Sequence, residues 1–310
     1  MSTRTASPPA SSAPDAPGVS RASRTLVTAL APAVWGTTYL VTSELLPAGH
    51  PMFAALVRAL PAGLLALLIA RALPSGSWWW KSAVLGALNI GVFFPLLFVA
   101  AERLPGGVAA TLGAIQPIIV TLLAVVVLSE RLSRRHLAWG AIGVLGVGLV
   151  VLGPDAALDP VGITAGLTGA ASMAAGSVLT KRWGRPAGVS AVGFAGWQLT
   201  AGGLVLLLPA LLVEGVPEAV DLGAAGGYFW LAVVGGLVAY TFWFEGLRTL
   251  PVTATALLGL LSPLVAAALG ILVLGESLDG LQVIGFALAL AALSGGQLSL
   301  STRSSSGRRA

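Results

Sequence analysis

The feature that most constrains the fold of this chain is an apolar block that occurs twice, 146 positions apart. Each copy begins with Leu-Pro, has a second proline inside its apolar stretch and ends with Glu-x-Leu. The matched residues are Pro105, Gly113, Pro117, Leu128, Glu130 and Leu132 in the first copy, and Pro251, Gly259, Pro263, Leu274, Glu276 and Leu278 in the second. A proline inside a helix removes one backbone hydrogen bond and kinks the helix, so Pro117 and Pro263 are candidate hinges. A defect at matched depth in two halves is typical of duplicated membrane transporters.

The composition predicts a membrane protein. The 310 residues are 56% apolar and 9% charged, whereas soluble domains carry about 25% charged residues. Because only helices and closed barrels satisfy their backbone in lipid, and spans of about 20 apolar residues are helical, we expect an all-α polytopic protein with ten transmembrane helices. The ten predicted spans are 26–45, 52–71, 82–101, 107–128, 137–153, 161–180, 190–213, 226–246, 252–274 and 281–298.

The positions of the basic residues predict the topology. With the N-terminus inside, 15 of the 17 basic residues fall on the inner side, the outer segments hold only Arg103, and Arg58 lies within a span. This bias follows the positive-inside rule, so we expect a multi-pass protein of the cell (plasma) membrane with both termini cytoplasmic. The net charge of +5 therefore reflects the topology. The chain has no basic patch with interleaved aromatic residues, so we expect no binding of nucleic acid.

The loop between residues 155 and 160 divides the ten spans into two sets of five. An odd number of spans per set inserts the second set upside down, which makes the duplication an inverted repeat. Residues 26–153 are the predicted first repeat and residues 161–298 the second. The Ser-, Ala- and Pro-rich segment 1–25 is predicted to be a disordered cytoplasmic tail, and residues 299–310 a second cytoplasmic tail.

Two stretches of the chain resemble a known family. LPGGVAATLGAIQPIIVTLLAVVVLSERLS and LPVTATALLGLLSPLVAAALGILVLGESLD are similar to the paired signature of the EamA family, in the drug/metabolite transporter superfamily. Trp35-Gly36, and Pro51 followed by Arg58, also resemble it, so that the similarity covers about residues 26–298. It implies two inverted EamA repeats of five helices, a central cavity and movement of small metabolites, commonly outward.

The amino-acid sequence of the first four spans most resembles the pigment-efflux subgroup, whose members are linked to export of the blue dye indigoidine. One departure concerns the residues after Trp35-Gly36. Many family members carry Asn and a basic residue there, whereas this chain has Thr37, Thr38 and Tyr39. A substrate site built on a lysine at this place is therefore not supported.

Polar groups inside a bilayer are costly and often functional. Arg58 is predicted about 6 residues inside its span, or about 9 Å from the outer boundary; it either extends outward to pair with Glu44 or Glu102 or faces a cavity and attracts an anionic group. Gln116 and Ser262 adjoin the mid-span prolines, where carbonyls freed by the kinks could face substrate. The alternative is a kink that serves packing alone.

Other mid-span residues have similar alternatives. Asn89 and Gln198 either face substrate or bond across helices. Aromatic side chains either line a cavity for flat substrates or mark the interface. The full set of candidate substrate-binding residues is Trp35, Tyr39, Arg58, Asn89, Gln116, Gln198, Tyr240, Trp243 and Ser262.

The remaining charged candidates are predicted to be structural. Glu130 and Glu276 recur at the ends of the repeated block, and we favour capping or bonding to the next helix over proton coupling. Glu245 precedes Arg248 by three residues, a spacing that permits an ion pair on a helix; a role in gating is the alternative.

The predicted function is a secondary transporter that exports a small organic metabolite, such as an amino acid, aromatic compound, pigment or drug, by alternating access. A passive facilitator is the alternative. An intramembrane enzyme is more remote. The chain lacks cysteine and a metal-binding motif, and His50 and His136, which could supply the base of a serine hydrolase, are predicted at loop edges near opposite faces. The chain also has no Walker A motif, so we expect a transporter that does not use ATP. We expect no cofactor and no metal, and the predicted partners are a small-molecule substrate and the lipid bilayer, with the chain a monomer or homodimer.

Overall fold

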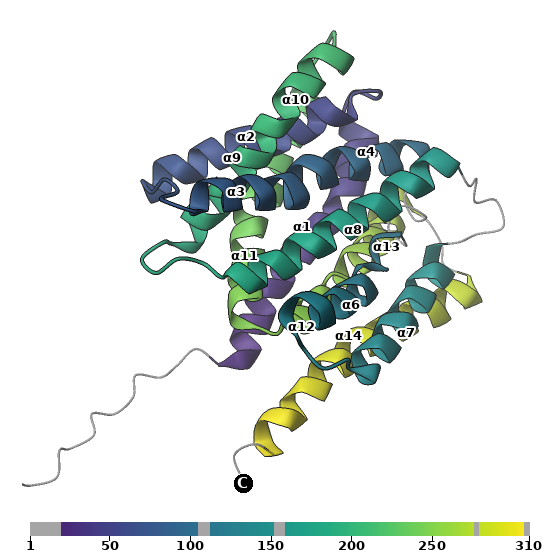
Figure 1. Ribbon diagram of the computed structural model, residues 1–310. Coiled ribbons are helices and arrows are strands. Elements are labelled where there is room, and N and C mark those ends of the chain that lie inside the picture. Colours follow the sequence, from purple (N-terminus) through teal and green to yellow (C-terminus); the bar gives the residue numbers. More distant parts are fainter. Residues whose placement is uncertain (1–19, 105–111, 152–158, 276–278, 307–310) are drawn as a thin grey trace, which may run out of the picture.

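The computed structural model describes residues 20–104, 112–151, 159–275 and 279–306. All regular elements in these ranges are helices (Figure 1). Those of the first half are α1 (Arg21–Leu45), α2 (Pro51–Ala70), α3 (Trp78–Gly86), the π-helix η1 (Ala87–Val92), α4 (Phe93–Arg103), α6 (Gln116–Leu128) and α7 (Arg134–Val151). Those of the second half are α8 (Pro160–Trp183), α9 (Ala191–Pro209), the π-helix η2 (Ala210–Glu214), α10 (Leu222–Phe229), the π-helix η3 (Trp230–Val238), α11 (Ala239–Thr249), α12 (Val252–Leu258), α13 (Leu261–Leu274) and α14 (Gly280–Ser306).

Many of these helices are built to cross a membrane. Within the described ranges, seven are long and apolar enough to do so: Arg21–Leu45, Pro51–Ala70, Trp78–Arg103, Pro160–Trp183, Ala191–Glu214, Leu222–Thr249 and Val252–Val273. Two shorter apolar helices span Gln116–Leu128 and Gly280–Gly296. Large apolar side chains on their outer faces are exposed, such as those of Val126 and Leu272, each 80% exposed. Exposed apolar side chains on long apolar helices suit a lipid surrounding, and the chain is a polytopic membrane protein.

The mid-span prolines interrupt their helices instead of only kinking them. A turn precedes Gln116, and α6 begins there with Pro117 as its second residue. Another turn follows Leu258, and Pro263 is the third residue of α13. In the first turn of a helix the missing N–H of proline costs no hydrogen bond. The turns therefore separate each span into two pieces.

A proline inside a helix frees the carbonyl four residues earlier, which for Pro263 is that of Gly259; here the expectation of a freed carbonyl needs a correction. The Gly259 carbonyl accepts a hydrogen bond from the N–H of Ser262 at 3.1 Å, because the turn closes with a bond between residues three apart. The carbonyl is therefore engaged within the turn. The break still matters, because it places Gly259 and Ser262 beside a cavity.

An ion-pair cluster joins the C-terminal ends of α8 and α11. Arg248 Nη2 lies 2.6 Å from Glu245 Oε1, which confirms the predicted pair. Arg185 Nη1 lies 2.6 Å from Glu245 Oε2 and adds a second cation that the sequence spacing did not indicate.

Two further cations of α8 bind carbonyls at the ends of neighbouring helices. Lys181 Nζ donates to the Leu250 carbonyl at 2.7 Å, and Arg182 Nη1 donates to the Val127 carbonyl at 3.2 Å. Cations are favourable at helix C-termini, where carbonyls lack partners. The basic clamp, as we call it, consists of Lys181, Arg182, Arg185, Glu245 and Arg248, and it ties together the ends of α6, α8 and α11.

The N-terminus of α2 is capped by a distant carboxylate. Glu214 accepts hydrogen bonds from the backbone N–H of Met52, at 2.8 Å to Oε2, and of Phe53, at 3.0 Å. A carboxylate is favourable at a helix N-terminus because unpaired N–H groups and the positive end of the dipole meet there. The contact fixes the end of η2 against α2.

We expect Glu214→Gln to lower the free energy of unfolding by about 1–2 kcal/mol, because the cap loses its charge. Thermal unfolding of the purified protein in detergent measures the effect. Glu218→Gln is the matched control, because Glu218 is exposed a few residues further on. Equal unfolding temperatures for the two variants would contradict the capping role.

Candidate functional site

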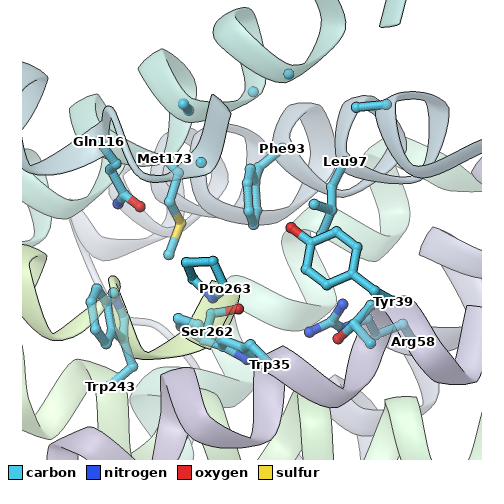
Figure 2. A pocket seen from close by; sticks show the side chains of 17 residues that line it. Trp35, Tyr39, Arg58, Phe93, Leu97, Gln116, Met173, Trp243, Ser262 and Pro263 are labelled. Carbon is cyan, nitrogen blue, oxygen red and sulfur yellow. The ribbon is translucent and has the colours of Figure 1, made fainter. Parts of the chain in front are cut away.

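A cavity lies where α1, α2, α4, α6, α8, α11 and α13 meet (Figure 2). Its volume is about 80 Å³. The lining residues are Trp35, Thr38, Tyr39, Arg58, Phe93, Leu97, Ala100, Gly113, Gln116, Gly166, Gly169, Ala170, Met173, Trp243, Gly259, Ser262 and Pro263. Six of the nine candidate substrate-binding residues are therefore brought together here, namely Trp35, Tyr39, Arg58, Gln116, Trp243 and Ser262.

Both interrupted helices contribute to this cavity at the point where they break. Gly113 and Gln116 come from the first break, and Gly259, Ser262 and Pro263 from the second. The candidate hinge Pro263 therefore lies at the cavity. Pro117, the other candidate hinge, is buried and is not among the lining residues.

Arg58 is buried in the protein instead of extending outward. Its side chain is 2% exposed, its Cζ lies 4.5 Å above the centre of the Phe94 ring, and Nη2 donates to the Gly235 carbonyl over a long 3.4 Å. The described part of the chain shows no ion pair between Arg58 and Glu44 or Glu102, so the outward pairing is wrong. The cavity position fits the other interpretation.

The acceptor that holds Arg58 comes from the π-helix η3. The Gly235 carbonyl also accepts a hydrogen bond from Trp35 Nε1 at 3.0 Å. A π-helix changes the hydrogen-bond pattern of a helix, and such segments recur at functional sites. Gly235 also lies directly against the guanidinium, because a Cβ added at this glycine would be 3.6 Å from Arg58 Nη2. The sequence contained no signal for this acceptor.

Aromatic rings form one wall of the cavity. The Trp35 ring centroid lies 5.1 Å from that of Trp243 and 4.9 Å from that of Tyr240. Tyr240 is 1% exposed and is not among the lining residues. It stands behind Trp35, and its hydroxyl donates to the Asn89 carbonyl at 3.5 Å, so it supports the wall instead of facing the cavity.

Asn89 and Gln198 bond to each other and do not line the cavity. Asn89 Nδ2 donates to Gln198 Oε1 at 2.8 Å and to Thr180 Oγ1 at 3.4 Å, and both amides are fully buried. The interpretation as substrate contacts is therefore not supported, and the interpretation as a bond across helices is confirmed.

The cavity lining leaves several buried donors unpaired. The unpartnered atoms are Thr38 Oγ1, Arg58 Nε and Nη1, Gln116 Nε2 and Trp243 Nε1. A buried polar atom without a partner costs about 1–3 kcal/mol, more when it is charged. The lining of this cavity therefore carries an energetic cost that is not offset by hydrogen bonds within the described residues.

The first of the two repeated glutamates, Glu130, does not line this cavity. Glu130 lies at a second hollow of about 200 Å³, which Thr121, Ser133 and His136 also line. The cap at the start of α7 comes from Ser133, whose Oγ accepts from the His136 N–H at 3.3 Å. Glu276 lies outside the described residues. The structural role of both glutamates stays a prediction.

Metal ligation has no support in the described part of the chain, where no group of three His, Asp or Glu side chains could hold an ion. Sequence reasoning missed several lining residues, among them Thr38, Phe93 and Met173. Ordinary apolar or hydroxyl residues in an apolar span carry no signal of which face they occupy, so only the packing of the helices identifies them.

The comparisons with known proteins identify the class. The model of the EamA-like transporter family matches the chain twice, at residues 23–152 and 160–295. The chain therefore belongs to this family, within the drug/metabolite transporter superfamily. It is a membrane transport protein and not an enzyme.

Particular relatives narrow the position within the family. The chain is 48% identical over 263 residues to Protein PecM of Dickeya dadantii, covering 85% of this chain and 88% of that protein. This places it in the PecM-like subgroup. It is 32% identical to a probable amino-acid metabolite efflux pump of Salmonella typhimurium, covering 64% of this chain and 70% of the pump. A solved crystal structure with 22% sequence identity matches at a TM-score of 0.73, covering 92% of this chain and 99% of that one, which shows the same fold.

Proposed function

We propose that this protein is a secondary transporter that exports a small organic metabolite across the inner (plasma) membrane by alternating access. The observation that carries the proposal is that two helices, each interrupted near its middle, meet at one aromatic cavity inside the protein. Discontinuous helices that meet in the interior are typical of substrate sites in transporters. An amino acid, aromatic compound, pigment or drug is the class of substrate.

The corresponding bounds of the helices support ten spans in two inverted repeats. The bounds of α4 (Phe93–Arg103) and α11 (Ala239–Thr249) differ by 146 positions at both ends. The same difference separates the last residues of η1 and η3, which are Val92 and Val238. The family match to each half supports the same division. Five helices in each half place the halves in opposite orientations.

The packing of the helices supports a pseudo-two-fold axis. The most extensive pairs are α2 with α9, α7 with α14, α4 with α8, α1 with α13, α6 with α8 and α1 with α11. Exchanging each helix for its counterpart in the other half returns the same set of pairs. The first two pairs exchange into themselves, as expected for helices beside the axis; Figure 1 shows α7 and α14 side by side.

The size of the cavity supports a change of conformation during transport. Sites for organic ligands usually measure about 300–1,000 Å³, whereas this cavity has about 80 Å³. The lining helices therefore separate to admit a solute, with the breaks before Pro117 and Pro263 as hinges. The cavity lies within one chain, so a monomer suffices, and a homodimer would carry two independent pathways.

The charge distribution supports a cytoplasmic location of both termini. The basic clamp gathers cations of α8 and α11 at one end of the helices, and basic residues favour the cytoplasmic side. Two kinds of relative, an uncharacterized inner membrane transporter YedA of Escherichia coli and the Salmonella efflux pump, support the membrane and the outward direction.

A comparison of metabolites exported by deletion and overexpressing cells tests the proposal, followed by uptake of the candidate into liposomes with and without a pH gradient. We expect counterflow stimulation by substrate on the opposite side. Uptake without such stimulation would favour the passive facilitator, and no exported metabolite in either strain would contradict the proposed function.

We propose that the basic clamp, besides tying the helix ends together, closes the cytoplasmic side of the pathway, which is the gating alternative for Glu245. The absence of native cysteine allows a direct test. In Ser262→Cys, the single thiol lies at the cavity, and adding Glu245→Gln breaks both ion pairs of the clamp. We expect labelling by an impermeant maleimide from the cytoplasmic side to rise about tenfold, because breaking a charged pair costs the closed state about 1.5 kcal/mol or more. Glu218→Gln in the same background is the control. Unchanged labelling would mean that the clamp does not close the pathway.

A further inference from the structure

The chemistry of the cavity lining narrows the class of solute. Its unpaired buried atoms are all potential donors, on Thr38, Arg58, Gln116 and Trp243. Buried donors normally have acceptors, so a solute that satisfies these atoms must carry acceptor oxygens. A solute rich in donors would leave them unpaired.

The charge of the lining restricts the solute further. Among the described residues that line the cavity, Arg58 is the one with a full charge, and none is Asp or Glu. Its Nε and Nη1 have no partner. An ammonium group would therefore meet a buried guanidinium and no carboxylate, whereas a carboxylate would neutralise Arg58 and form charge-assisted hydrogen bonds.

The donors lie at two ends of the cavity. Figure 2 shows Arg58 with Tyr39 at one end, and Gln116 with Trp243 at the other. Trp35 connects them, since it shares the Gly235 acceptor with Arg58 and its ring centroid lies 5.1 Å from that of Trp243. The surface between the two sets of donors is therefore aromatic, and it favours a flat ring.

We propose that the substrate is a planar aromatic compound with a carboxylate at one end, a carbonyl oxygen at the other and no cationic group. The carboxylate accepts from the free N–H groups of Arg58, the ring lies against Trp35, and the carbonyl oxygen accepts from Gln116 Nε2 or Trp243 Nε1. This inference rests on the proposed function, because it assigns the solute of the same cavity. It excludes free amino acids, which carry an ammonium group.

Three matched benzene derivatives test the inference by calorimetric titration of the whole protein in lipid nanodiscs. 4-Carbamoylbenzoate has both acceptor ends, benzoate lacks the carbonyl end, and 4-(aminomethyl)benzamide replaces the carboxylate with an ammonium group. We expect 4-carbamoylbenzoate to bind about fivefold more tightly than benzoate, since one neutral hydrogen bond contributes about 1 kcal/mol. We expect no binding of the cation.

Variants assign each end to its residues. Arg58→Gln is expected to weaken binding of 4-carbamoylbenzoate about 10- to 100-fold, because a charge-assisted bond is lost. Trp243→Phe keeps an aromatic ring but loses Nε1, and it should reduce the advantage over benzoate. Arg103→Gln is the matched control, since Arg103 pairs with Asp159 at 3.6 Å and does not line the cavity.

The outcomes separate this inference from the proposed function. Binding of the cation as tightly as the acid, failure of all three probes to bind, or equal affinities for wild type and Arg58→Gln would each overturn the assigned solute class. If Arg58→Gln does not fold, Trp243→Phe and the ranking of the three probes on the wild type still decide. Transport itself is judged separately, by the export comparison and by counterflow of the exported metabolite.

Discussion

Gly63→Val is expected to prevent the formation of a stable folded protein. Gly63 lies in α2, where it touches the backbone of α9. An added Cβ would lie 2.8 Å from the carbonyl carbon of Leu199 and 2.5 Å from Thr200 Oγ1. Backbone atoms cannot rotate away as a side chain can, so valine would force the two helices apart. Overpacking costs about 1–3 kcal/mol, occasionally more, and this position is at the upper end because α2 and α9 form the most extensive helix pair.

The effect is measured by size-exclusion chromatography and thermal unfolding in detergent. We expect aggregation, or a loss of about 3 kcal/mol or more out of a total of about 5–15 kcal/mol. Gly226→Val is the matched control, because Gly226 is also helical and an added Cβ there meets no atom within 4 Å in the part of the chain that the structure describes. Both variants carry the same change in helix propensity. Similar stability of the two would show that the close approach of α2 and α9 is dispensable.

The helical membrane fold was predictable because its causes are local and repeated. Long apolar segments leave a helix as the means to satisfy the backbone in lipid, and Pro117 and Pro263 recur at one spacing. The prolines alone could not indicate that each helix is interrupted completely and not only kinked. Whether a helix kinks or breaks at a proline depends on how the preceding residues pack. Before Pro263 the chain forms a turn, which the hydrogen bond from the Ser262 N–H to the Gly259 carbonyl closes.

The sequence indicated which polar residues are unusual in the candidate site, but not which of them face the cavity. Polarity marked Arg58, Gln116 and Asn89 as unusual in a bilayer, but it could not say what each one faces. Asn89 meets Gln198 because two helices from different halves of the chain cross there. Arg58 faces the cavity because another helix supplies the Gly235 carbonyl. Such partners are far apart in sequence, and they become visible only once the helices are packed.

The second large effect is expected at Gly113, which lines the cavity beside the break before Pro117. We expect Gly113→Leu to abolish transport while leaving the protein folded. Gly113 lines the cavity, and an added Cβ would have no atom of the described residues within 4 Å. The side chain of leucine can therefore enter the open space without a clash, and it would occupy much of a cavity of about 80 Å³.

Two measurements check this expectation. Counterflow of the exported metabolite should fall about tenfold or more, since filling a site removes the apolar contacts and hydrogen bonds worth at least about 1.4 kcal/mol to the solute. Maleimide labelling of Ser262→Cys should also slow, because leucine shields the thiol on the other interrupted helix; this readout does not depend on knowing the substrate. Gly226→Leu is the control for the added side chain, and both variants should unfold at the wild-type temperature. Transport at the wild-type rate by a folded Gly113→Leu protein would place the pathway elsewhere, because a solute cannot pass through a space that a leucine side chain fills.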